Sequence, residues 1–141
     1  MNLTPVIRSY RDTDKTGIIA LWGIVFPGGT AWNQAEDVIA RKRKVQPDLF
    51  YVALQDDRVV GTVIAGYDGV RGWIHRLAVH PDIRRCGLAT QLMQRAGRGL
   101  KEIGCPKLNL QVRASNLEVL KFYQALGYAV EDRASLGKPL L

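Results

Sequence analysis

The stretch Val79–Met93, VHPDIRRCGLATQLM, joins a strand-like apolar run to a helix without an ordinary helix cap. A helix start usually carries Ser, Thr, Asp or Asn, whose side chain accepts hydrogen bonds from the first-turn N–H groups. Here two arginines, Cys86 and Gly87 precede the helix, and the small residue Ala89 lies in its first turn. Uncapped N–H groups flanked by positive charge favour an anion, and a pyrophosphate group suits them well.

The common glycine-rich phosphate motifs do not account for this helix start. The Rossmann pattern GxGxxG is absent, and no acidic residue follows a strand at the distance that this fold requires. The pattern GxxxxGK[ST] is absent as well. The sequence therefore gives no support to a dinucleotide-binding or nucleotide-hydrolysing domain.

Apolar periodicity along the chain predicts an α/β protein with the element order βααβββαβαβ and helices on both faces of a mixed sheet. An Asn33 cap is expected at the second helix, with Glu36 three residues later, and an Asp56–Asp57 turn between two strands predicts a hairpin. The predicted strands are 6–11, 49–55, 58–67, 72–79, 107–113 and 128–135, and the predicted helices are 16–26, 33–44, 88–103 and 116–127.

Length and composition are those of one globular domain, residues 1–141, with its own core. No apolar run approaches the roughly 18 residues of a membrane span, and the first residues lack the apolar core of a signal peptide, so a cytoplasmic location is expected. Cys86 and Cys105 are accompanied by neither CxxC nor paired histidines. Both are therefore predicted to be reduced thiols, and no metal is expected.

Positive charge is the main bias of the composition. Lys and Arg number 20 against 13 Asp and Glu, giving a formal net charge of +7. This balance favours a polyanionic partner or a phosphorylated ligand. The densest cluster, RKRK at Arg41–Lys44, is predicted to be a solvated helix C-terminus rather than a nucleic-acid patch, because no aromatic-rich basic motif accompanies it.

The uncapped helix start resembles a motif of the GNAT family of N-acetyltransferases, in which Arg or Gln, then Gly, then Gly or Ala open the central helix. Arg84, Gly87 and Ala89 match these three positions. Arg85 stands where many members have glycine, and it either adds a phosphate contact or points outward. The segments GTVIAGYDGVRGW, GCPKLNLQV and SLGKPLL also resemble the small bacterial YpeA-type members of the family.

A second segment, RASNLEVLKFYQALGY, resembles the downstream motif of the same family. It is matched by Asn116, Phe122, Tyr123, Gly127 and Tyr128. The two motifs occur in the expected order on predicted elements of the right type, and the resemblance extends over nearly the whole chain. It implies a GNAT-like α/β fold with a mixed, mostly antiparallel sheet of six to seven strands.

The resemblance also implies the chemistry. Acetyl-CoA is the acetyl donor, and a primary amine, in a small molecule or a peptide, attacks its thioester directly in a ternary complex. No membrane partner is implied, a nucleic acid is not expected, and a monomer or homodimer is expected. The resemblance assigns cofactor binding to Leu77, Val79, Arg84, Arg85, Cys86, Gly87, Leu88, Ala89 and Asn116.

Within that scheme Tyr123 occupies the family's position for the general acid. A phenol with a pKa of about 10 is also chemically suited to protonating a leaving thiolate. The alternative is a core aromatic, since Leu120, Tyr123 and Leu126 share helical spacing. Asn116 is expected either to reach the cofactor or to act only as a helix N-cap.

The general base is less clearly marked. N-terminal alanine acetyltransferases of the family carry Glu where this chain has Gln111, and an amide cannot accept the proton. His75, two residues before Leu77, is the candidate base, since serotonin-type acetyltransferases carry a catalytic His there; the alternative is a half-buried His that only forms hydrogen bonds. His80 is expected to have a structural role in its turn, and the Cys86 thiol a packing role.

Two other classes of function remain open at this stage. An acyl-CoA-binding sensor would keep the phosphate loop with little catalysis, which Gln111 would explain. A nucleic-acid-binding domain would use the +7 charge and would bind with strong salt dependence.

Overall fold

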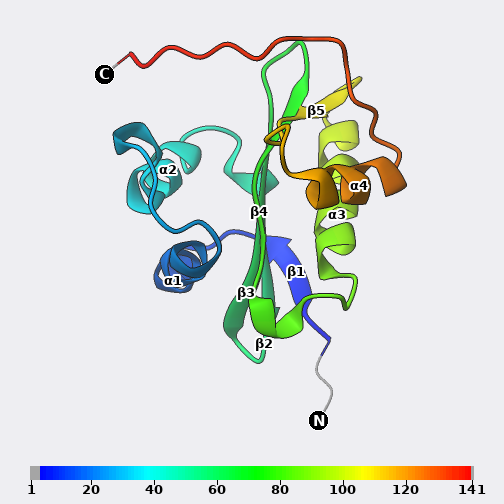
Figure 1. Ribbon diagram of the computed structural model, residues 1–141. Helices are drawn as coiled ribbons and strands as arrows, with labels where there is room; N and C mark the ends of the chain where they lie inside the picture. The colour runs from blue at the N-terminus through cyan, green and yellow to red at the C-terminus, as the bar shows by residue number, and fades with distance from the viewer. Residues whose placement is uncertain (1–3, 141) are drawn as a thin grey trace. The chain divides into compact units, whose positions relative to one another are not determined.

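The computed structural model describes residues 4–140 of the chain, which divides into two compact units, Met1–Leu110 and Gln111–Leu141. The first unit contains strands β1 (Val6–Ser9), β2 (Phe50–Gln55), β3 (Arg58–Tyr67), β4 (Gly72–Val79) and β5 (Leu108–Leu110), with helices α1 (Lys15–Val25), α2 (Ala35–Lys42) and α3 (Leu88–Glu102) (Figure 1). The second unit contains helix α4 (Leu117–Ala125).

The five strands form one mixed sheet in the order β1-β2-β3-β4-β5. The first four are antiparallel neighbours, whereas β5 runs parallel to β4 and pairs only with Gly72–Ile74. The two-residue turn between β2 and β3 has positive φ at both Asp56 and Asp57, 52° and 61°. This is the backbone that a tight hairpin turn requires, and it confirms the predicted hairpin.

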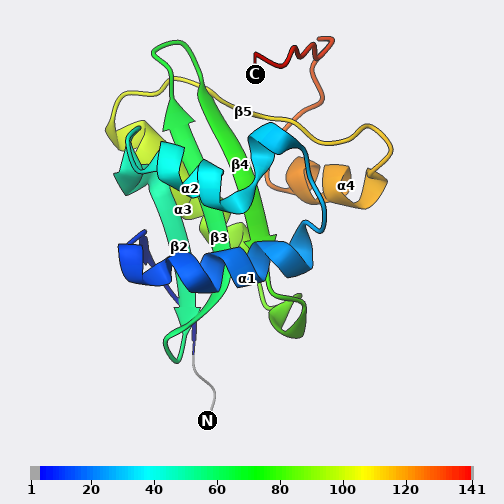
Figure 2. The same ribbon diagram turned by 90° about the vertical axis from the view of Figure 1, so that its left-hand side faces the viewer.

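Helices cover both faces of the sheet, as expected. Helices α1 and α2 lie on one face and α3 on the other (Figures 1 and 2). On the α1–α2 face the core is built around Trp22, which stacks with Phe50 at a centroid distance of 6.1 Å. On the other face α3 buries Leu88, Leu92, Met93, Ala96, Gly99 and Leu100.

The expectation of six to seven strands is wrong for the described residues, which contain five. The predicted strand 128–135 is irregular, and Val130 at its centre is 69% exposed. Three consecutive charged residues, 131–133, interrupt its alternation, so it has no continuous apolar face to bury. The predicted strand 107–113 is shortened to Leu108–Leu110.

The predicted Asn33 cap is also wrong. Asn33 ends a short 3-10 helix, Ala31–Asn33, and its N–H bonds to Thr30 O, so its backbone is already turned. Helix α2 begins at Ala35, after the extended residue Gln34, and has no side-chain cap. It ends at Lys42 rather than Lys44.

Other features of the first unit and of α4 agree with the sequence. Strand β4 has the predicted bounds, and α3 ends close to Gly104, whose φ is 86°. Helix α4 begins after Asn116 and is followed by Gly127, whose φ is 98°. Among residues 4–140, no helix combines the length and apolar character needed to cross a membrane.

The close approach of α3 to β2 depends on Gly99. A Cβ atom added there would overlap the Tyr51 hydroxyl, whereas one added at Gly97 would meet nothing within 4 Å. Gly99→Ala is expected to lower the free energy of unfolding by about 1–3 kcal/mol, because the core must shift to admit the methyl group. Gly97→Ala is the matched control and is expected to raise it by up to about 1 kcal/mol through helix propensity. Urea unfolding measures both, and a shift in the same direction would contradict the packing argument.

Candidate active site

Strand β4 contains a β-bulge at the centre of the predicted site. His75 pairs with Ile64 and Ala78 pairs with Thr62, so Arg76 and Leu77 together oppose the single residue between those partners. Arg76 takes the strain of the extra residue, with a φ of 54°. Bulges of this kind redirect a strand and are common beside active sites.

The bulge changes which main-chain groups face β3. After the bulge, His80 N–H donates to Val60 O at 2.8 Å. Because every second residue of an antiparallel strand directs its N–H and C=O groups toward the same neighbour, those of Ala78 also point toward β3. The N–H and C=O groups of Leu77 and Val79 consequently point to the opposite edge. Because β5 pairs with β4 only up to Ile74, this edge has no ladder partner in the described sheet beyond that residue.

A short chain of hydrogen bonds holds the bulge. Trp22 Nε1 donates to Thr62 Oγ1 at 2.8 Å, and the Thr62 hydroxyl donates to Arg76 O at 2.9 Å. Trp22 and Thr62 are 1% and 0% exposed, so neither polar group has water as an alternative partner. The carbonyl that the bulge removes from the regular ladder therefore obtains a buried donor from β3.

The Arg76 side chain extends this connection to α1 and to the segment between α1 and α2. Its guanidinium lies 4.6 Å from the Trp22 ring centroid and 5.2 Å from that of Phe26, and it donates to Asn33 O at 2.6 Å. Arg76 is not among the site residues predicted from the sequence. The available signal was an arginine within the otherwise largely apolar strand GWIHRLAV.

The segment from Arg84 to Ala89 forms the uncapped helix start that the sequence predicts. Arg85 and Gly87 have positive φ, 67° and 81°, and no side chain caps α3. A Cβ at Gly87 would meet nothing within 4 Å, so there is space for a side chain at this position. Glycine is favoured here because the backbone has a positive φ. Arg84 Nε lies 3.4 Å from Val79 O, which brings this segment next to the free edge of β4.

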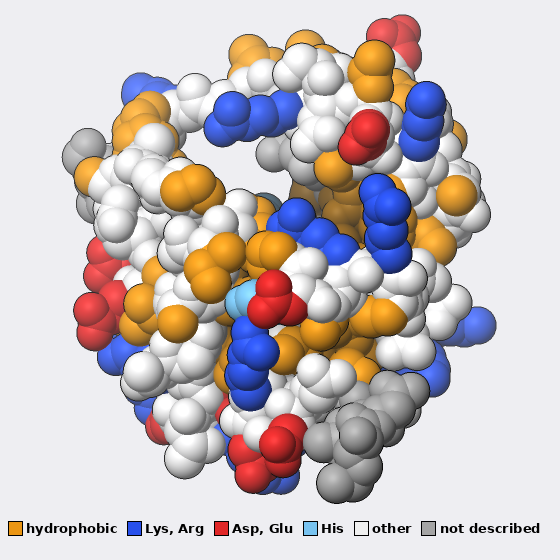
Figure 3. Space-filling view, turned by 60° about the horizontal axis from the view of Figure 1, so that its bottom comes forward, with side chains coloured by type: hydrophobic (Ala, Val, Ile, Leu, Met, Phe, Trp, Pro, Cys, Tyr) orange, Lys and Arg blue, Asp and Glu red, His pale blue; other side chains and the backbone are white. Residues whose placement is uncertain are grey.

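The surroundings of this segment are rich in positive charge. Arg84 and Arg85 are exposed, and Arg58 lies nearby with an ion pair to Asp82 at 3.7 Å. Figure 3 looks onto the end of the molecule that carries this segment and shows Lys and Arg side chains near its middle, with acidic side chains among them. The charges of Arg84 and Arg85 therefore add to the positive end of the α3 dipole.

Two side chains near this loop have local roles. Cys86 is exposed, and its thiol donates to Ile83 O, so the expectation of a packing thiol is wrong. The sulfur lies in an exposed loop and not in the core. His80 Nδ1 accepts from Asp82 N–H at 3.1 Å and so caps the 3-10 turn Pro81–Ile83, in line with its predicted structural role.

His75 lies on the α1–α2 face of β4, because it pairs with Ile64, which belongs to the core cluster on that face. Its side chain reaches solvent. Partial removal of its hydration, followed by the positive charges of Lys42 and Arg76, lowers the pKa of His75 below its usual value. The imidazole is therefore neutral at pH 7, the form that accepts a proton.

The cluster RKRK forms the solvated helix end that the sequence predicts, except at Lys42. Lys42 is half-buried, its Nζ donates to Ala65 O at 2.6 Å, and burial lowers its pKa to about 8. Arg43 pairs with Asp12 at 3.0 Å, and Arg41 donates to Trp32 O. Arg41, Arg43 and Lys44 are exposed, as predicted, and Lys42 departs from the prediction because the α2 C-terminus packs onto β3.

The second unit holds the remaining predicted site residues. Asn116 Oδ1 accepts from Val119 N–H at 3.4 Å, so this side chain caps α4. Tyr123 is 8% exposed, and burial together with the nearby Tyr128 raises its pKa to about 12. The phenol is thus a weaker acid than the sequence argument assumed. Gln111 Nε2 donates to Ser135 Oγ at 2.6 Å.

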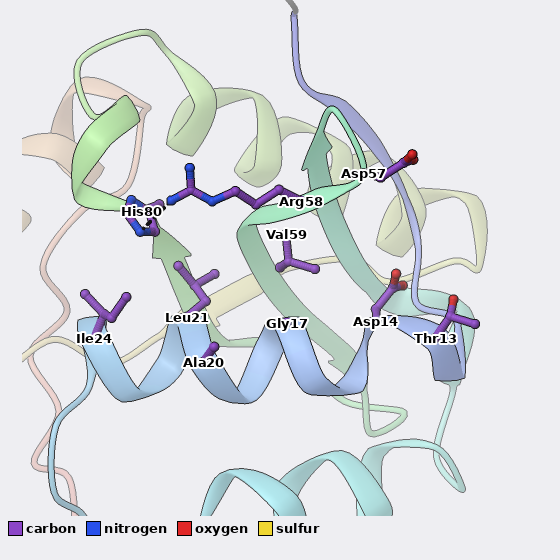
Figure 4. A pocket seen from close by; sticks show the side chains of 10 residues that line it. All are labelled: Thr13, Asp14, Gly17, Ala20, Leu21, Ile24, Asp57, Arg58, Val59 and His80. Atoms are coloured by element: carbon purple, nitrogen blue, oxygen red, sulfur yellow. Dashed lines mark hydrogen bonds between the residues drawn. The ribbon is translucent and has the colours of Figure 1, made fainter.

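A groove of about 350 Å³ lies elsewhere in the first unit, between α1 and the turn that joins β2 to β3. Gly17 and Leu21 of α1 face Val59 across it, and Arg58 and His80 lie at its rim (Figure 4). None of the residues to which sequence analysis assigned catalysis or cofactor binding lines this groove. In the part of the chain that the structure describes, no group of three or more His, Cys, Asp or Glu side chains is placed to hold a metal ion.

Comparison with known proteins shows the family of this chain. The model of the acetyltransferase (GNAT) family matches residues 16–128. The chain belongs to the GNAT acetyltransferase family. It is 41% identical over 138 residues to an acetyltransferase of Pectobacterium atrosepticum, and 42% identical over 139 residues to one of Sodalis glossinidius. Each match covers 96% of this chain and 95% of the relative.

Solved structures of N-acetyltransferases show the same fold at low identity. The aminoglycoside N-acetyltransferase AAC(6')-Iy, in complex with CoA, superposes with a TM-score of 0.80 at 20% identity and covers 100% of this chain and 98% of its own. The ribosomal-protein-S18-alanine N-acetyltransferase of Escherichia coli gives 0.73 at 23% identity, covering 88% and 77%. The CoA complex of the PaiA N-acetyltransferase of Thermoplasma acidophilum gives 0.79 at 20% identity, covering 94% of each chain.

The hydrogen bonds behind the bulge make a direct prediction about stability. Thr62→Val removes the hydroxyl and leaves Trp22 Nε1 and Arg76 O without their buried partner. The expected loss is about 1–3 kcal/mol in the free energy of unfolding, measured by chemical denaturation. Thr62→Ser keeps the hydroxyl and loses one buried methyl group, worth about 0.8 kcal/mol. A valine variant as stable as the serine variant would show that these bonds do not stabilise the bulge.

Proposed function

We propose that this GNAT acetyltransferase transfers the acetyl group of acetyl-CoA to a primary amine by direct attack within a ternary complex. The proposal rests on two features of the first unit that lie next to each other. The uncapped start of α3 adjoins, through Arg84 and Val79, the edge of β4 that the bulge leaves without a ladder partner. One extended cofactor could therefore place its phosphate groups at the start of α3 and its carbonyl groups along the edge of β4, and both places offer hydrogen-bond donors.

Each part of that surface has a proposed role toward acetyl-CoA. The N–H groups of residues 85–89 hold the pyrophosphate, supported by their positive-φ turns and by the α3 dipole. Main-chain groups of Leu77 and Val79 hold the pantetheine arm and the thioester oxygen. A donor aimed at the oxyanion that develops during attack typically contributes about 3–4 kcal/mol to transition-state stabilisation.

Two residues of the second unit, Tyr123 of α4 and its N-cap Asn116, have proposed roles toward the cofactor. Tyr123 protonates the leaving thiolate, and its raised pKa of about 12 keeps the phenol fully protonated at working pH. A phenol with this pKa gives its proton to the thiolate when desolvation in the closed complex raises the pKa of the thiol as well. Asn116 uses its Oδ1 in capping α4, so its Nδ2 is the group proposed to reach the cofactor.

His75 is the proposed general base for the attacking amine. It stands two residues before Leu77 on the strand that holds the thioester, and its lowered pKa keeps it unprotonated at pH 7. Gln111 stands in the position of the glutamate found in N-terminal alanine acetyltransferases and cannot serve as a base.

Calorimetric titration with acetyl-CoA, with ATP as control ligand, tests the cofactor assignment, and Tyr123→Phe tests the acid. Acetyl-CoA is expected to bind and ATP to bind much more weakly.

The phenylalanine variant is expected to keep its affinity for acetyl-CoA and to lose about 10²–10⁴-fold in kcat, measured as thiol release with amines. An unchanged rate would remove Tyr123 from the mechanism. Tight binding without transfer to any amine would favour a sensor, and absence of binding would overturn the proposal.

His75→Ala separates the base from a merely structural histidine through pH dependence. The ratio of wild-type to variant kcat/KM cancels the titration of the amine itself. This ratio is expected to reach about 10²–10⁴ above the pKa of His75 and to fall toward unity as the pH drops below it, because protonated imidazole accepts no proton. Since the pKa is lowered, the fall lies below about pH 6.5. A ratio that stays constant with pH would exclude His75 as the base.

A further inference from the structure

Cationic side chains without acidic partners gather on the α1–α2 face of the sheet. Lys42, at the end of α2, donates to Ala65 O of β3, and Arg76 of β4 donates to Asn33 O. Carbonyl oxygens satisfy the hydrogen bonds of these groups but do not neutralise their charge. Neither side chain takes part in a salt bridge within residues 4–140, where the ion pairs involve other cations.

The elements packed around this face supply little acid. The segments 16–34, which include most of α1, and 59–67 of β3 contain no charged residue at all. On α2, Glu36 pairs with Lys15 at 3.0 Å, and Asp37 lies in the first turn, at the other end of the helix from Lys42. On β4 the charged or titratable residues are His75 and Arg76.

Both cations lie near His75: Lys42 donates to the carbonyl of Ala65, which pairs with Ile74 on β4, and Arg76 directly follows His75. Both charges that perturb it are positive, those of Lys42 and Arg76, so the two cations act on the same point of β4. Half-buried charges are normally paired, because removing them from water costs free energy that a counter-charge offsets. The rings of Trp22 and Phe26 offset part of this cost for Arg76. They provide no such compensation to Lys42, whose ammonium has a carbonyl as its partner.

We propose that the acceptor of this enzyme is an amine that also carries a carboxylate, and that Lys42 and Arg76 provide the positive site for this carboxylate beside His75. The inference rests on the proposed function and specifies its substrate class. Polyamines and aminoglycosides would bring further positive charges to a face that already lacks anions, and like charges facing each other across an interface are strongly unfavourable. The likeness to an aminoglycoside acetyltransferase, at 20% identity, concerns the fold alone.

The first test compares matched acceptors at saturating acetyl-CoA, with thiol release as the readout. Each L-amino acid is paired with its α-amide, and spermidine and neamine serve as polycations. The best carboxylate-bearing acceptor is expected to exceed its amide at least tenfold in kcat/KM, which corresponds to about 1.4 kcal/mol. A preference for the amides or for the polycations would overturn the inference while leaving acetyl transfer, and so the proposed function, intact.

Variants assign the preference to the site. Lys42→Met is expected to raise KM for the carboxylate-bearing acceptor about tenfold, with KM for acetyl-CoA unchanged, and Lys42→Arg is expected to restore most of the affinity. Lys44→Met removes the same charge from an exposed position two residues away and is expected to change neither constant. Equal effects of the Lys42→Met and Lys44→Met variants would show that net charge, and not this site, is responsible.

A binding measurement judges the anion site without any turnover. The ¹⁵N-labelled full chain is titrated with acetate and, separately, with acetamide, which has nearly the same shape but no charge. Acetate alone is expected to shift the amide signals around Lys42, His75 and Arg76, and Lys42→Met is expected to abolish the shifts. Equal shifts with acetamide, or none with acetate, would overturn the inference. Failure of acetyl-CoA to bind in calorimetry would instead identify the proposed function as the error.

Discussion

The bulge in β4 is the constraint on which the candidate site depends. In a regular antiparallel ladder, alternate residues would continue to give their N–H and C=O groups to β3. One extra residue at Arg76 reverses this alternation, so that Leu77 and Val79 direct their main chain toward the edge that β5 leaves open. Polar groups that ordinary sheet pairing would consume are thereby kept for another partner. A strand that is half-buried in the core thus also presents a line of main-chain donors and acceptors.

This arrangement carries a local cost that the surrounding core offsets. A non-glycine residue at positive φ is strained by about 1–2 kcal/mol, and Arg76 has a φ of 54°. Against this stand the buried hydrogen bond from Thr62, the two aromatic rings below the guanidinium and its bond to Asn33 O. The same side chain therefore stabilises the bulge, fixes the segment after α1 and places positive charge near His75. Structure and electrostatics are coupled through one residue, so changes at Arg76 affect both together.

Local chemistry explains which parts of the fold could be predicted from sequence. The bounds of β4, the Asp56–Asp57 hairpin and the Asn116 cap of α4 follow from short-range patterns and agree with the structure. The bulge left no such trace, because alternation within eight residues looks almost the same with or without one inserted position. The predicted strand 128–135 failed for another reason. Three consecutive charged residues, 131–133, interrupt its alternation and leave it no continuous apolar face to bury.

The candidate site shows the same division between local and long-range information. The uncapped start of α3 was readable because the absence of a capping side chain and the presence of Gly87 are local features. The surroundings of Lys42 were not, since its burial depends on α2 packing against β3, more than twenty residues away in sequence. A run of four basic residues looks uniformly solvated until tertiary contacts distinguish its members. Arg76 was missed for the same reason, because its rings and its carbonyl partner come from other elements.

The bulge also affects which sequence changes this strand tolerates during evolution. Apart from changes at Arg76, whose side chain stabilises the bulge, substitutions between Ile74 and Val79 alter side chains and leave the direction of the main-chain groups as it is. Deleting a single residue there would restore regular alternation and turn Leu77 and Val79 back toward β3, however well the remaining side chains were conserved. The number of residues in this segment is thus a more stringent requirement than their identity. Among relatives of this chain, length variation should therefore accumulate in the turns and stop at this strand.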